Sequence, residues 1–489
     1  MLFNSTAFAI FFTVVLVIYW LLYKWRAYQN LALLIASLFF YYQFHYSFPF
    51  YLMSLITVGY LFGKQIGKVT DAKKKKTLLI IGVCLLSFGL VYLKYSNLLL
   101  SGIPMLSAWQ ASALGILVPI GISYYTFSSI GYITDVYRGD IEPEGDYVTY
   151  AAYISFFPHI LSGPIPTATM VLPQFKEKSR LTVEKIDQSV GEIVWGLFKK
   201  MVVSDNIGTA VSYCFRQSHD LNGSTLLLGA ILFTIQVYAD FSGYSDIARG
   251  LAGLLGIEIP QNFKIPFSSR SVTEFWRRWH ISLTTWFYTY IFNPLVDSLR
   301  FLGNSSIVIA LIFTFCLSGL WHGADWKYVI YGLINSLVLV YEFFTRKQRK
   351  KLFKKVPVFI NNWLSNILTM LFICFLLIFF RANSINDAFY IISRVVSASV
   401  VSAPVQYIVK YFSWTIPLIL VEYIQKNGEY TWDMAHWGIG DRAPWNTIDD
   451  GKKKAIGLAI KALIYSVIIM AIVLYAKKQN MAEYYYFKF

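Results

Sequence analysis

The sequence predicts an all-α integral membrane protein that crosses the bilayer many times. Hydrophobic residues make up 56% of the chain and charged residues only 14%, whereas soluble domains carry about 25% charged residues. The mean hydropathy is +0.51. Apolar runs long enough to cross hydrocarbon recur along the whole chain. Because backbone in hydrocarbon must pair its own polar groups, as a helix does, we predict a polytopic helical bundle.

The predicted elements are helices of about 20 mainly apolar residues, the length that a bilayer requires. The first run, Ala7 to Tyr23, is followed by Lys24 and Arg26 and not by a cleavage site, so we expect it to span. We expect about 11 segments to cross fully and the others to be re-entrant or interfacial. The candidates lie near residues 7–23, 31–46, 48–63, 77–94, 113–134, 148–163, 189–213, 223–239, 243–257, 303–321, 326–344, 358–380, 404–424 and 457–476.

The charged residues predict how the bundle is oriented. The formal net charge is +16, which in a soluble protein would raise the question of nucleic acid. Here the cations cluster in short loops between apolar segments, notably Lys64 to Lys76 and Arg346 to Lys355. Such loops are typical of the cytoplasmic side. We therefore expect the lipid bilayer and no nucleic acid as a partner, with the N-terminus outside.

The chain is predicted to form one membrane domain over residues 1–489. We divide it into N-terminal helices (1–134), a catalytic core (135–345) and C-terminal helices (346–489). Residues 135–300 mix charges, prolines and glycines with short apolar runs. Irregular backbone survives at membrane depth only where protein or water covers its polar groups. This part should therefore line a cavity, whereas the polar stretch Gln425 to Lys454 reads as a loop.

His322 is the strongest candidate for chemistry. No charged residue occurs from Phe301 to Ala324, so His322 is the one readily protonated side chain in that stretch. An ionisable residue at membrane depth is costly and suggests a functional site, and imidazole suits general acid–base work. Trp321 precedes it and is a candidate for substrate binding. The alternative is a buried histidine that only bridges two helices.

His280 is the second candidate. If its segment is helical, Trp276, Trp279 and His280 share one face, which makes the two tryptophans candidate substrate-binding residues. Arg277, paired in sequence with Arg278, could contact the phosphates of a donor. The alternative is an interfacial helix whose aromatic rings mark headgroup depth and whose arginines reach out to water.

The same segment carries local helix signals. Ser271 and Glu274 form a capping-box pattern at the start of the predicted helix. Glu274 and Arg278 are spaced for an ion pair along it.

A polar stretch from Tyr238 to Arg249 interrupts an apolar run with carboxylates and hydroxyls. Asp246 and Arg249 are spaced to neutralise one another. Asp240 has no obvious local partner. It could orient a histidine, but a structural salt bridge to another part of the chain is the favoured interpretation. Ser242 and Tyr244 are candidate substrate-binding residues with Asp240. In an earlier segment, Asp135 and Arg138 are also expected to form a structural pair.

Other chemistries find no support in the sequence. The four cysteines are scattered without pairing or metal spacing, so neither disulfides nor a metal site is expected. Phosphate-binding glycine loops and the nucleophile-elbow pattern are also missing. His159 is more typical of a loop residue than of a cavity residue. The residues thus favour histidine acid–base chemistry inside a membrane bundle.

These features resemble the membrane-bound O-acyltransferase family, in the bacterial branch that includes the membrane subunit of alginate O-acetylation. The resemblance runs in order along the chain and rests on a set of motifs. They are Val118–Phe127, Phe156–Pro158 with Ser162–Pro164, Asp240–Asp246, Asn262–Phe267, Phe275–Leu283, Leu320–Ala324 and the C-terminal Tyr484–Phe489.

The resemblance implies a fold and roles for the two histidines. The family fold is a bundle of about 11 spans around a tunnel that carries an acyl group from a cytosolic thioester toward the other face. The histidine of the Trp-His-Gly motif is catalytic in that family, which points to His322, and His280 matches a second tunnel histidine. Two segments depart from the branch, Phe287–Leu295 and Ile165–Thr167, and they leave the acceptor and partner open.

The function expected is therefore O-acyl transfer, with acetyl as the favoured group, in the bacterial cytoplasmic membrane. His322 would take the proton of an acceptor hydroxyl as it attacks the thioester, and His280 or backbone N–H groups would stabilise the oxyanion. The donor would be acetyl-CoA or another acyl thioester, with no permanently bound cofactor. As the family implies, an exported hydrolase-like acetyltransferase partner would complete transfer to a cell-envelope polysaccharide. The alternatives are D-alanyl transfer to teichoic acid from a carrier protein, and a transporter without covalent chemistry.

Overall fold

The computed structural model describes residues 1–100, 117–397, 411–425 and 450–476. All regular secondary structure within these ranges is helical, and turns and irregular segments connect the helices. Within these ranges five helices are long and apolar enough to cross a membrane. They are α4 (Ala72–Leu100), α10 (Gly223–Leu254), α14 (Asn304–His322), α15 (Trp326–Phe353) and α16 (Val358–Arg381). The all-α prediction is thereby confirmed for the described residues, and the number of about 11 spans stays a prediction.

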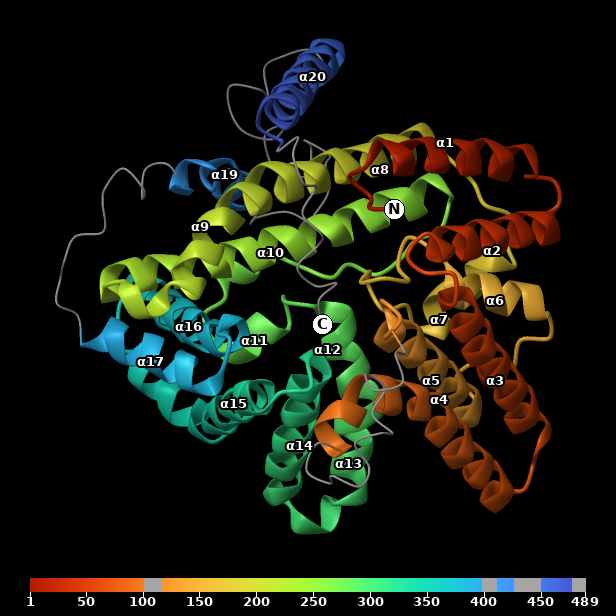
Figure 1. Ribbon diagram of the computed structural model, residues 1–489, viewed down its shortest axis with the longest axis horizontal. Helices are drawn as coiled ribbons and strands as arrows, with labels where there is room; N and C mark the ends of the chain where they lie inside the picture. The colour runs from red at the N-terminus through yellow and green to blue at the C-terminus, as the bar shows by residue number, and fades with distance from the viewer. Residues whose placement is uncertain (101–116, 398–410, 426–449, 477–489) are drawn as a thin grey trace.

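The N-terminal helices pack together on one side of the molecule (Figure 1). Glycines on α3 allow this packing, because a Cβ at Gly63 would collide with the ring of Tyr132. A side chain at Gly59 would likewise strike Tyr150. The group comprises α1 (Thr6–Leu21), α2 (Arg26–Tyr42), α3 (Phe48–Lys68), α4, α5 (Ile122–Arg138), α6 (Tyr147–Ser155), α7 (Ala168–Val171) and the 3₁₀ turn η2 (Leu172–Phe175).

The central helix α10 runs across the molecule beside α8 and α9 (Figure 1). It is one unbroken helix, so the prediction of two segments, 223–239 and 243–257, was wrong. The two carboxylates that suggested a break, Asp240 and Asp246, form ion pairs with lysines and stay inside the helix. Its neighbours are α8 (Val183–Leu197), the π-helical η3 (Phe198–Ser204), α9 (Asp205–Arg216) and η4 (Ser218–Asp220).

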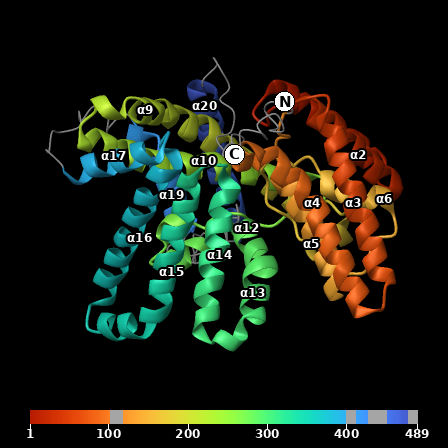
Figure 2. The same cartoon turned by 60° about the horizontal axis from the view of Figure 1, so that its bottom comes forward.

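Helices α15 and α16 lie on the opposite side of the bundle from α2 to α6, with α14 between them (Figure 2). Between α10 and α14 the chain makes only short elements, as expected for a segment that lines a cavity. These are η5 (Pro266–Ser268), α11 (Val272–Trp276), α12 (Ile281–Phe287), the π-helical η6 (Tyr288–Phe292), α13 (Asn293–Ser298) and η7 (Arg300–Leu302). After α16 follow α17 (Ile385–Val396), α19 (Ile416–Gln425) and α20 (Asp450–Tyr475).

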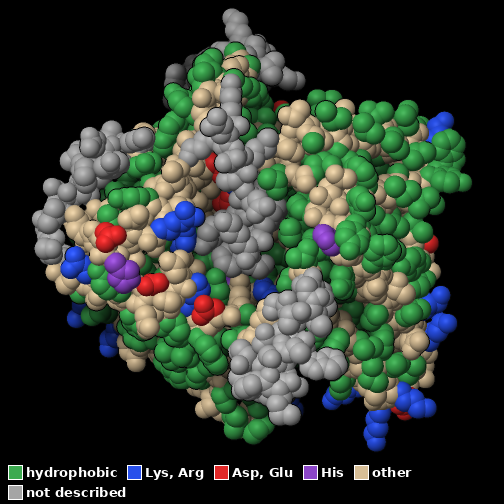
Figure 3. Space-filling model, in the orientation of Figure 1, with side chains coloured by type: hydrophobic (Ala, Val, Ile, Leu, Met, Phe, Trp, Pro, Cys, Tyr) green, Lys and Arg blue, Asp and Glu red, His purple; other side chains and the backbone are tan. Residues whose placement is uncertain are grey.

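The surface is that of a multi-pass membrane protein. Hydrophobic side chains cover much of the face seen in Figure 3, and Lys and Arg gather near the turn between α3 and α4. Large apolar residues such as Phe313 and Leu368 are more than half exposed. The α3–α4 turn and the α15–α16 turn, which carry the two basic stretches, lie at the same end of the bundle in Figure 2. The loop expected over Gln425 to Lys454 and the motif Tyr484–Phe489 lie almost wholly outside the described residues.

Candidate active site

His322 is the last residue of α14, and α4 caps that helix end. The Lys94 ammonium donates to the Trp321 carbonyl oxygen, and the Tyr95 hydroxyl donates to the Leu320 carbonyl oxygen over 2.9 Å. The last carbonyls of a helix have no partner within the helix and carry partial negative charge, so a cation is stabilised there. This cap fixes the Trp321–His322 peptide, at the end of α14, against α4.

Close contact between α14 and α15 fixes the same helix end from the other side. A Cβ on Gly319 would collide with the Tyr328 carbonyl oxygen, and one on Gly332 would collide with the Phe315 carbonyl oxygen. Small residues of this kind let membrane helices approach backbone to backbone. The pair therefore explains why glycine stands three residues before His322.

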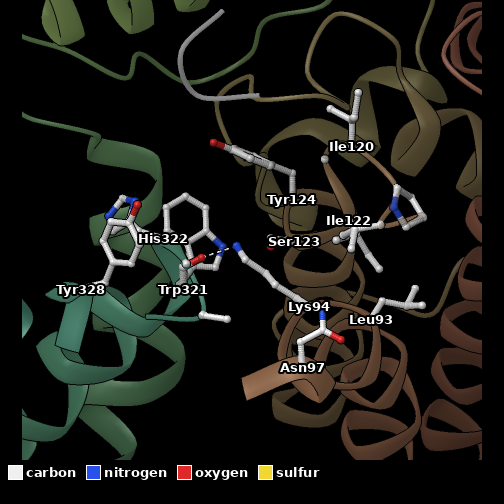
Figure 4. Close-up of a pocket in the computed structure, with 15 residues that line it drawn as sticks. Leu93, Lys94, Asn97, Ile120, Ile122, Ser123, Tyr124, Trp321, His322 and Tyr328 are labelled. Carbon is white, nitrogen blue, oxygen red and sulfur yellow. Dashed lines mark hydrogen bonds between the residues drawn. The ribbon is translucent and has the colours of Figure 1, made fainter. Parts of the chain in front are cut away.

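A cavity of about 360 Å³ opens at His322 (Figure 4). The His322 side chain is only 4% exposed, and its ring packs at 4.6 Å from Trp321 and 4.9 Å from Phe380 between ring centres. The cavity wall comes from α4, α5, α14 and the start of α15. Its residues are Leu93, Lys94, Asn97, Val118 to Tyr124, Trp321 to Ala324, and Tyr328.

Two polar groups on this wall have no hydrogen-bond partner within the described part of the chain. They are the hydroxyl of Tyr124 and the indole N–H of Trp321, both buried. Buried polar groups are normally paired, because each unpaired one costs free energy. Together with the Lys94 ammonium they offer hydrogen-bond donors to a molecule that enters the cavity.

The cavity lies at the end of the bundle opposite the basic stretches. Lys94 on α4 and Tyr328 on α15 line it, while Lys76 and Arg346 stand eighteen residues away along the same two helices. Eighteen helical residues extend about 27 Å, close to the roughly 30 Å of a hydrocarbon core. The cavity and the basic stretches therefore lie toward opposite ends of these two helices.

His280 occupies a tight turn, so the condition under which it would share one helix face with Trp276 and Trp279 is not met. The helix α11 ends at Trp276, and His280 has a left-handed backbone (φ 46°). The local signals did hold: Ser271 caps α11 by accepting from the Glu274 N–H. Glu274 and Arg278 form an ion pair at 2.9 Å.

The turn brings His280 beside Trp321. Its imidazole packs edge-on against Phe241, 4.6 Å away between ring centres, and lies 5.9 Å from Trp321. His280 and His322 therefore both contact the Trp321 ring. Unlike His322, His280 does not line the cavity.

A second cavity of about 510 Å³ lies on the basic-end side of His322, along α14. Trp276 and Arg277 line it, as do Phe287, Tyr288 and Phe292 from a segment where the sequence departs from the resembling branch. Its wall is mostly apolar, with hydroxyls from Thr284, Thr285, Thr314 and Ser318. Two cavities are thus described along α14, and the tunnel expected from the resemblance stays a prediction.

The other predicted substrate-binding residues line neither cavity. Trp279 packs between Phe275 and Phe263. Asp240 forms the salt bridge that the residues favoured, with Lys200 at 2.9 Å. Ser242 accepts from Lys199, and the Tyr244 hydroxyl donates to the Pro158 carbonyl oxygen. These side chains form packed interior next to the site.

Two predicted ion pairs do not form. Asp246 pairs with Lys199 and Arg249 with Glu192, because η3 and α8 bring these partners to α10. The Asp246–Arg249 prediction considered only local spacing and was wrong.

The expected Asp135–Arg138 pair is also replaced. Asp135 accepts from the Tyr290 hydroxyl at 2.7 Å, and Arg138 lies over the Tyr290 ring. His159, for which a loop role was favoured, is buried and bonds to the Tyr153 carbonyl oxygen.

Sequence reasoning missed several residues of the site. Lys94 was taken as the end of a span, although a lone lysine in an apolar run is itself a signal. Tyr124 and Asn262 belonged to recognised motifs but were given no role. Nothing in the local sequence marks Tyr328, which reaches the site through the close packing of α14 and α15.

Comparison with known proteins agrees with this geometry. A family model described as the membrane-bound O-acyltransferase family matches residues 143–385, which include both histidines and both cavities' α14 wall. The chain is 35% identical over 353 residues to the probable alginate O-acetylase AlgI of Pseudomonas putida, covering 70% of each chain.

More distant relatives carry other names. A peptidoglycan O-acetyltransferase of Helicobacter pylori is 28% identical over 406 residues, covering 77% of this chain and 75% of the relative. A teichoic acid D-alanyltransferase of Bacillus subtilis is 30% identical over 269 residues, covering 52% of this chain and 67% of the relative. All three names describe transfer of an acyl group to an envelope or exported polymer.

Proposed function

The chain belongs to the membrane-bound O-acyltransferase family, and from that membership we propose that it is an O-acetyltransferase acting on a cell-envelope or exported polysaccharide. The observation that carries the proposal is the place of His322. It lies on the wall of a cavity at the C-terminal end of α14, while a second cavity lies along α14 toward its N-terminal end. An acceptor and a donor can thus reach one site from opposite sides.

The proposed orientation follows the basic stretches. Lys64 to Lys76 and Arg346 to Lys355 face the cytoplasm, so the first cavity and the N-terminus face outward. The donor is acetyl-CoA or another acyl thioester, which arrives from the cytoplasm by way of the second cavity. Arg277 lines that cavity and is exposed, so it can contact a donor phosphate.

His322 acts as the general base in the proposed reaction. It takes the proton of the acceptor hydroxyl as that oxygen attacks the thioester carbonyl carbon. The new C–O bond forms, the C–S bond breaks, and the proton passes from His322 to the departing thiolate. The Lys94 ammonium and the Trp321 indole N–H are the donors on the cavity wall that can stabilise the oxyanion.

An exported hydrolase-like acetyltransferase partner receives the acetyl group on the outer face and passes it to the polymer. The outward cavity is large enough for one side chain or a short substrate arm, and its rim includes the loop Val118 to Gly121. The alginate, peptidoglycan and teichoic acid named for the relatives define the range of acceptors to test.

The test compares His322→Gln with His219→Gln in membrane vesicles from cells that make the polymer. His219 is exposed and lies far from either cavity wall, paired with Asp387. Loss of a positioned base should slow acetyl-CoA consumption and polymer O-acetylation by about 10²–10⁴-fold, whereas the control keeps full activity. Protein amount and thermal unfolding must match between the two variants.

Retained acetylation in His322→Gln would refute the assigned role. A second arm replaces acetyl-CoA by a D-alanyl carrier protein. Labelled D-alanine on the polymer, with no consumption of acetyl-CoA, would support the teichoic acid reaction and reject acetyl transfer.

A further inference from the structure

Asn262 is the residue that determines how His280 is held. It lies just before α11 in the segment between α10 and the His280 turn, and it is 1% exposed. Its carbonyl oxygen accepts from the Ile281 N–H at 2.9 Å. Its side-chain oxygen accepts from the Ser282 N–H at 3.2 Å and from the Ser282 hydroxyl at 2.8 Å. The amide nitrogen donates to Ser245 on α10.

The same side-chain oxygen lies 3.1 Å from Nδ1 of His280. A backbone N–H is always a donor, so the Asn262 atom that faces the Ser282 N–H must be the amide oxygen. An amide oxygen only accepts hydrogen bonds. Nδ1 of His280 must therefore carry the hydrogen in this contact.

The surroundings of His280 also favour the uncharged ring. The imidazole is 1% exposed and packs against Phe241 and Trp321. Burial disfavours the charged form of a histidine. An uncharged imidazole with hydrogen on Nδ1 presents a lone pair, and no hydrogen, at Nε2.

We propose that Asn262 is a positioning residue that holds His280 as the Nδ1–H tautomer, so that Nε2 carries a lone pair and no hydrogen. This inference rests on the proposed function for its effect on turnover but not for its geometry. It changes the role expected from the sequence, because a ring in this state cannot donate from Nε2 to an oxyanion. Stabilising the oxyanion falls to other donors, such as Lys94 and Trp321.

The left-handed turn makes sense as part of this arrangement. His280 is one of two non-glycine residues with positive φ in the described part of the chain. Such a backbone is strained for a residue with a side chain and persists where surrounding contacts impose it. The hydrogen bonds from residues 280–282 to Asn262 supply these contacts, together with the Lys264 N–H that donates to the Arg278 carbonyl oxygen.

The first test reads the tautomer directly and does not depend on activity. Full-length protein labelled with ¹⁵N-histidine is placed in lipid nanodiscs, and the His280 signals are assigned by comparison with His280→Ala. We expect a protonated Nδ1 and an unprotonated Nε2 at neutral pH. A ring protonated on Nε2 overturns the inference, even if acetyl transfer itself is confirmed.

The second test uses variants of Asn262. Asn262→Leu keeps a similar volume without an acceptor, so the single tautomer should be lost and kcat should fall about 10–100-fold, as for other residues that orient a histidine. Asn262→Asp keeps an accepting oxygen toward Nδ1 and can accept from Ser245, so it should restore the tautomer and most of the activity. If Asn262→Leu does not fold, Asn262→Asp and the spectrum of the unmodified protein still decide the question.

Ser282→Ala is the matched control. It removes another hydrogen bond to the same Asn262 oxygen but leaves the His280 contact in place. The Nδ1–H signal should persist in this variant. Loss of the tautomer in Ser282→Ala but not in Asn262→Leu would show that Asn262 does not position the ring.

Discussion

Two polar regions interrupt the apolar interior of this bundle, and they differ in whether their groups are paired. In the ionic centre, η3 and α10 bring Lys199 against Asp246 at 2.6 Å and Lys200 against Asp240 and Asp205, each at 2.9 Å. At the cavity, Tyr124 and Trp321 present buried polar groups that no described residue satisfies. The side chains of both regions are buried or nearly so.

The difference separates structure from function within one motif-rich core. Removing one partner of a buried ion pair is destabilising, because it leaves the other charge without compensation. Unpaired donors beside a cavity cost stability, but they can still form hydrogen bonds with a ligand. Substitutions in the ionic centre should therefore change stability first, whereas substitutions at the cavity should change activity first.

The largest effect is expected in the ionic centre, from Lys200→Met. Removing the lysine leaves Asp240 and Asp205 buried without their cation, and breaking a buried pair costs about 3–5 kcal/mol. The variant should unfold at a lower temperature in detergent than the unmodified protein. Lys185→Met is the control, because Lys185 pairs with the exposed Glu258 near the surface, and a surface pair contributes about 0–1 kcal/mol.

The opposite outcome for Lys200→Met would contradict the division into a structural and a functional region. An unchanged unfolding temperature in Lys200→Met, with acetyl transfer lost, would make the ionic centre part of the reaction and not of the scaffold.

A smaller effect is expected from Gly332→Ala, at the close contact between α14 and α15 that positions His322. The added methyl would collide with the Phe315 carbonyl oxygen and lie 3.0 Å from the Cys316 Cα. Forcing α14 and α15 apart should cost about 1–3 kcal/mol, as for other overpacked sites. Activity should fall with stability, because His322 ends α14.

Gly89→Ala provides the control for that prediction. A Cβ at Gly89 meets no atom within 4 Å, so the substitution adds a methyl to α4 without a clash. Its unfolding temperature should equal or exceed that of the unmodified protein, because alanine favours a helix over glycine, and its activity should be unchanged. A similar loss in both variants would mean that helix contact is not the cause.

The sequence predicted the class of fold and the central residue, because both depend on local composition. An uncharged stretch that ends in one histidine is visible without any tertiary contact, and so is the recurrence of apolar runs. The family resemblance indicated in addition that His280 is a second tunnel histidine. The conformation of His280 was missed, since its left-handed turn is imposed by Asn262, eighteen residues earlier in the chain.

The ion pairs show the same limit. Spacing along one helix suggested Asp246 with Arg249, but each finds a partner on another element. Long-range pairing decides such cases, and a single sequence does not contain it. The same holds for Lys94, whose role appears only when the end of α14 lies beside α4.

The smallest and sharpest prediction compares two adjacent tyrosines on α5. Tyr124 lines the cavity, and its buried hydroxyl has no hydrogen-bond partner among the described residues, whereas the Tyr125 hydroxyl lies 3.4 Å from that of Tyr41 in the packed interior. Tyr124→Phe should leave stability unchanged or slightly raised and slow acetyl transfer about tenfold, which corresponds to 1.4 kcal/mol. Tyr125→Phe should lower stability by about 1 kcal/mol and leave the rate nearly unchanged. Unfolding temperature and kcat measured on both variants give a direct answer. If the two substitutions have the same effect on the rate, the unpaired hydroxyl of Tyr124 does not meet a substrate.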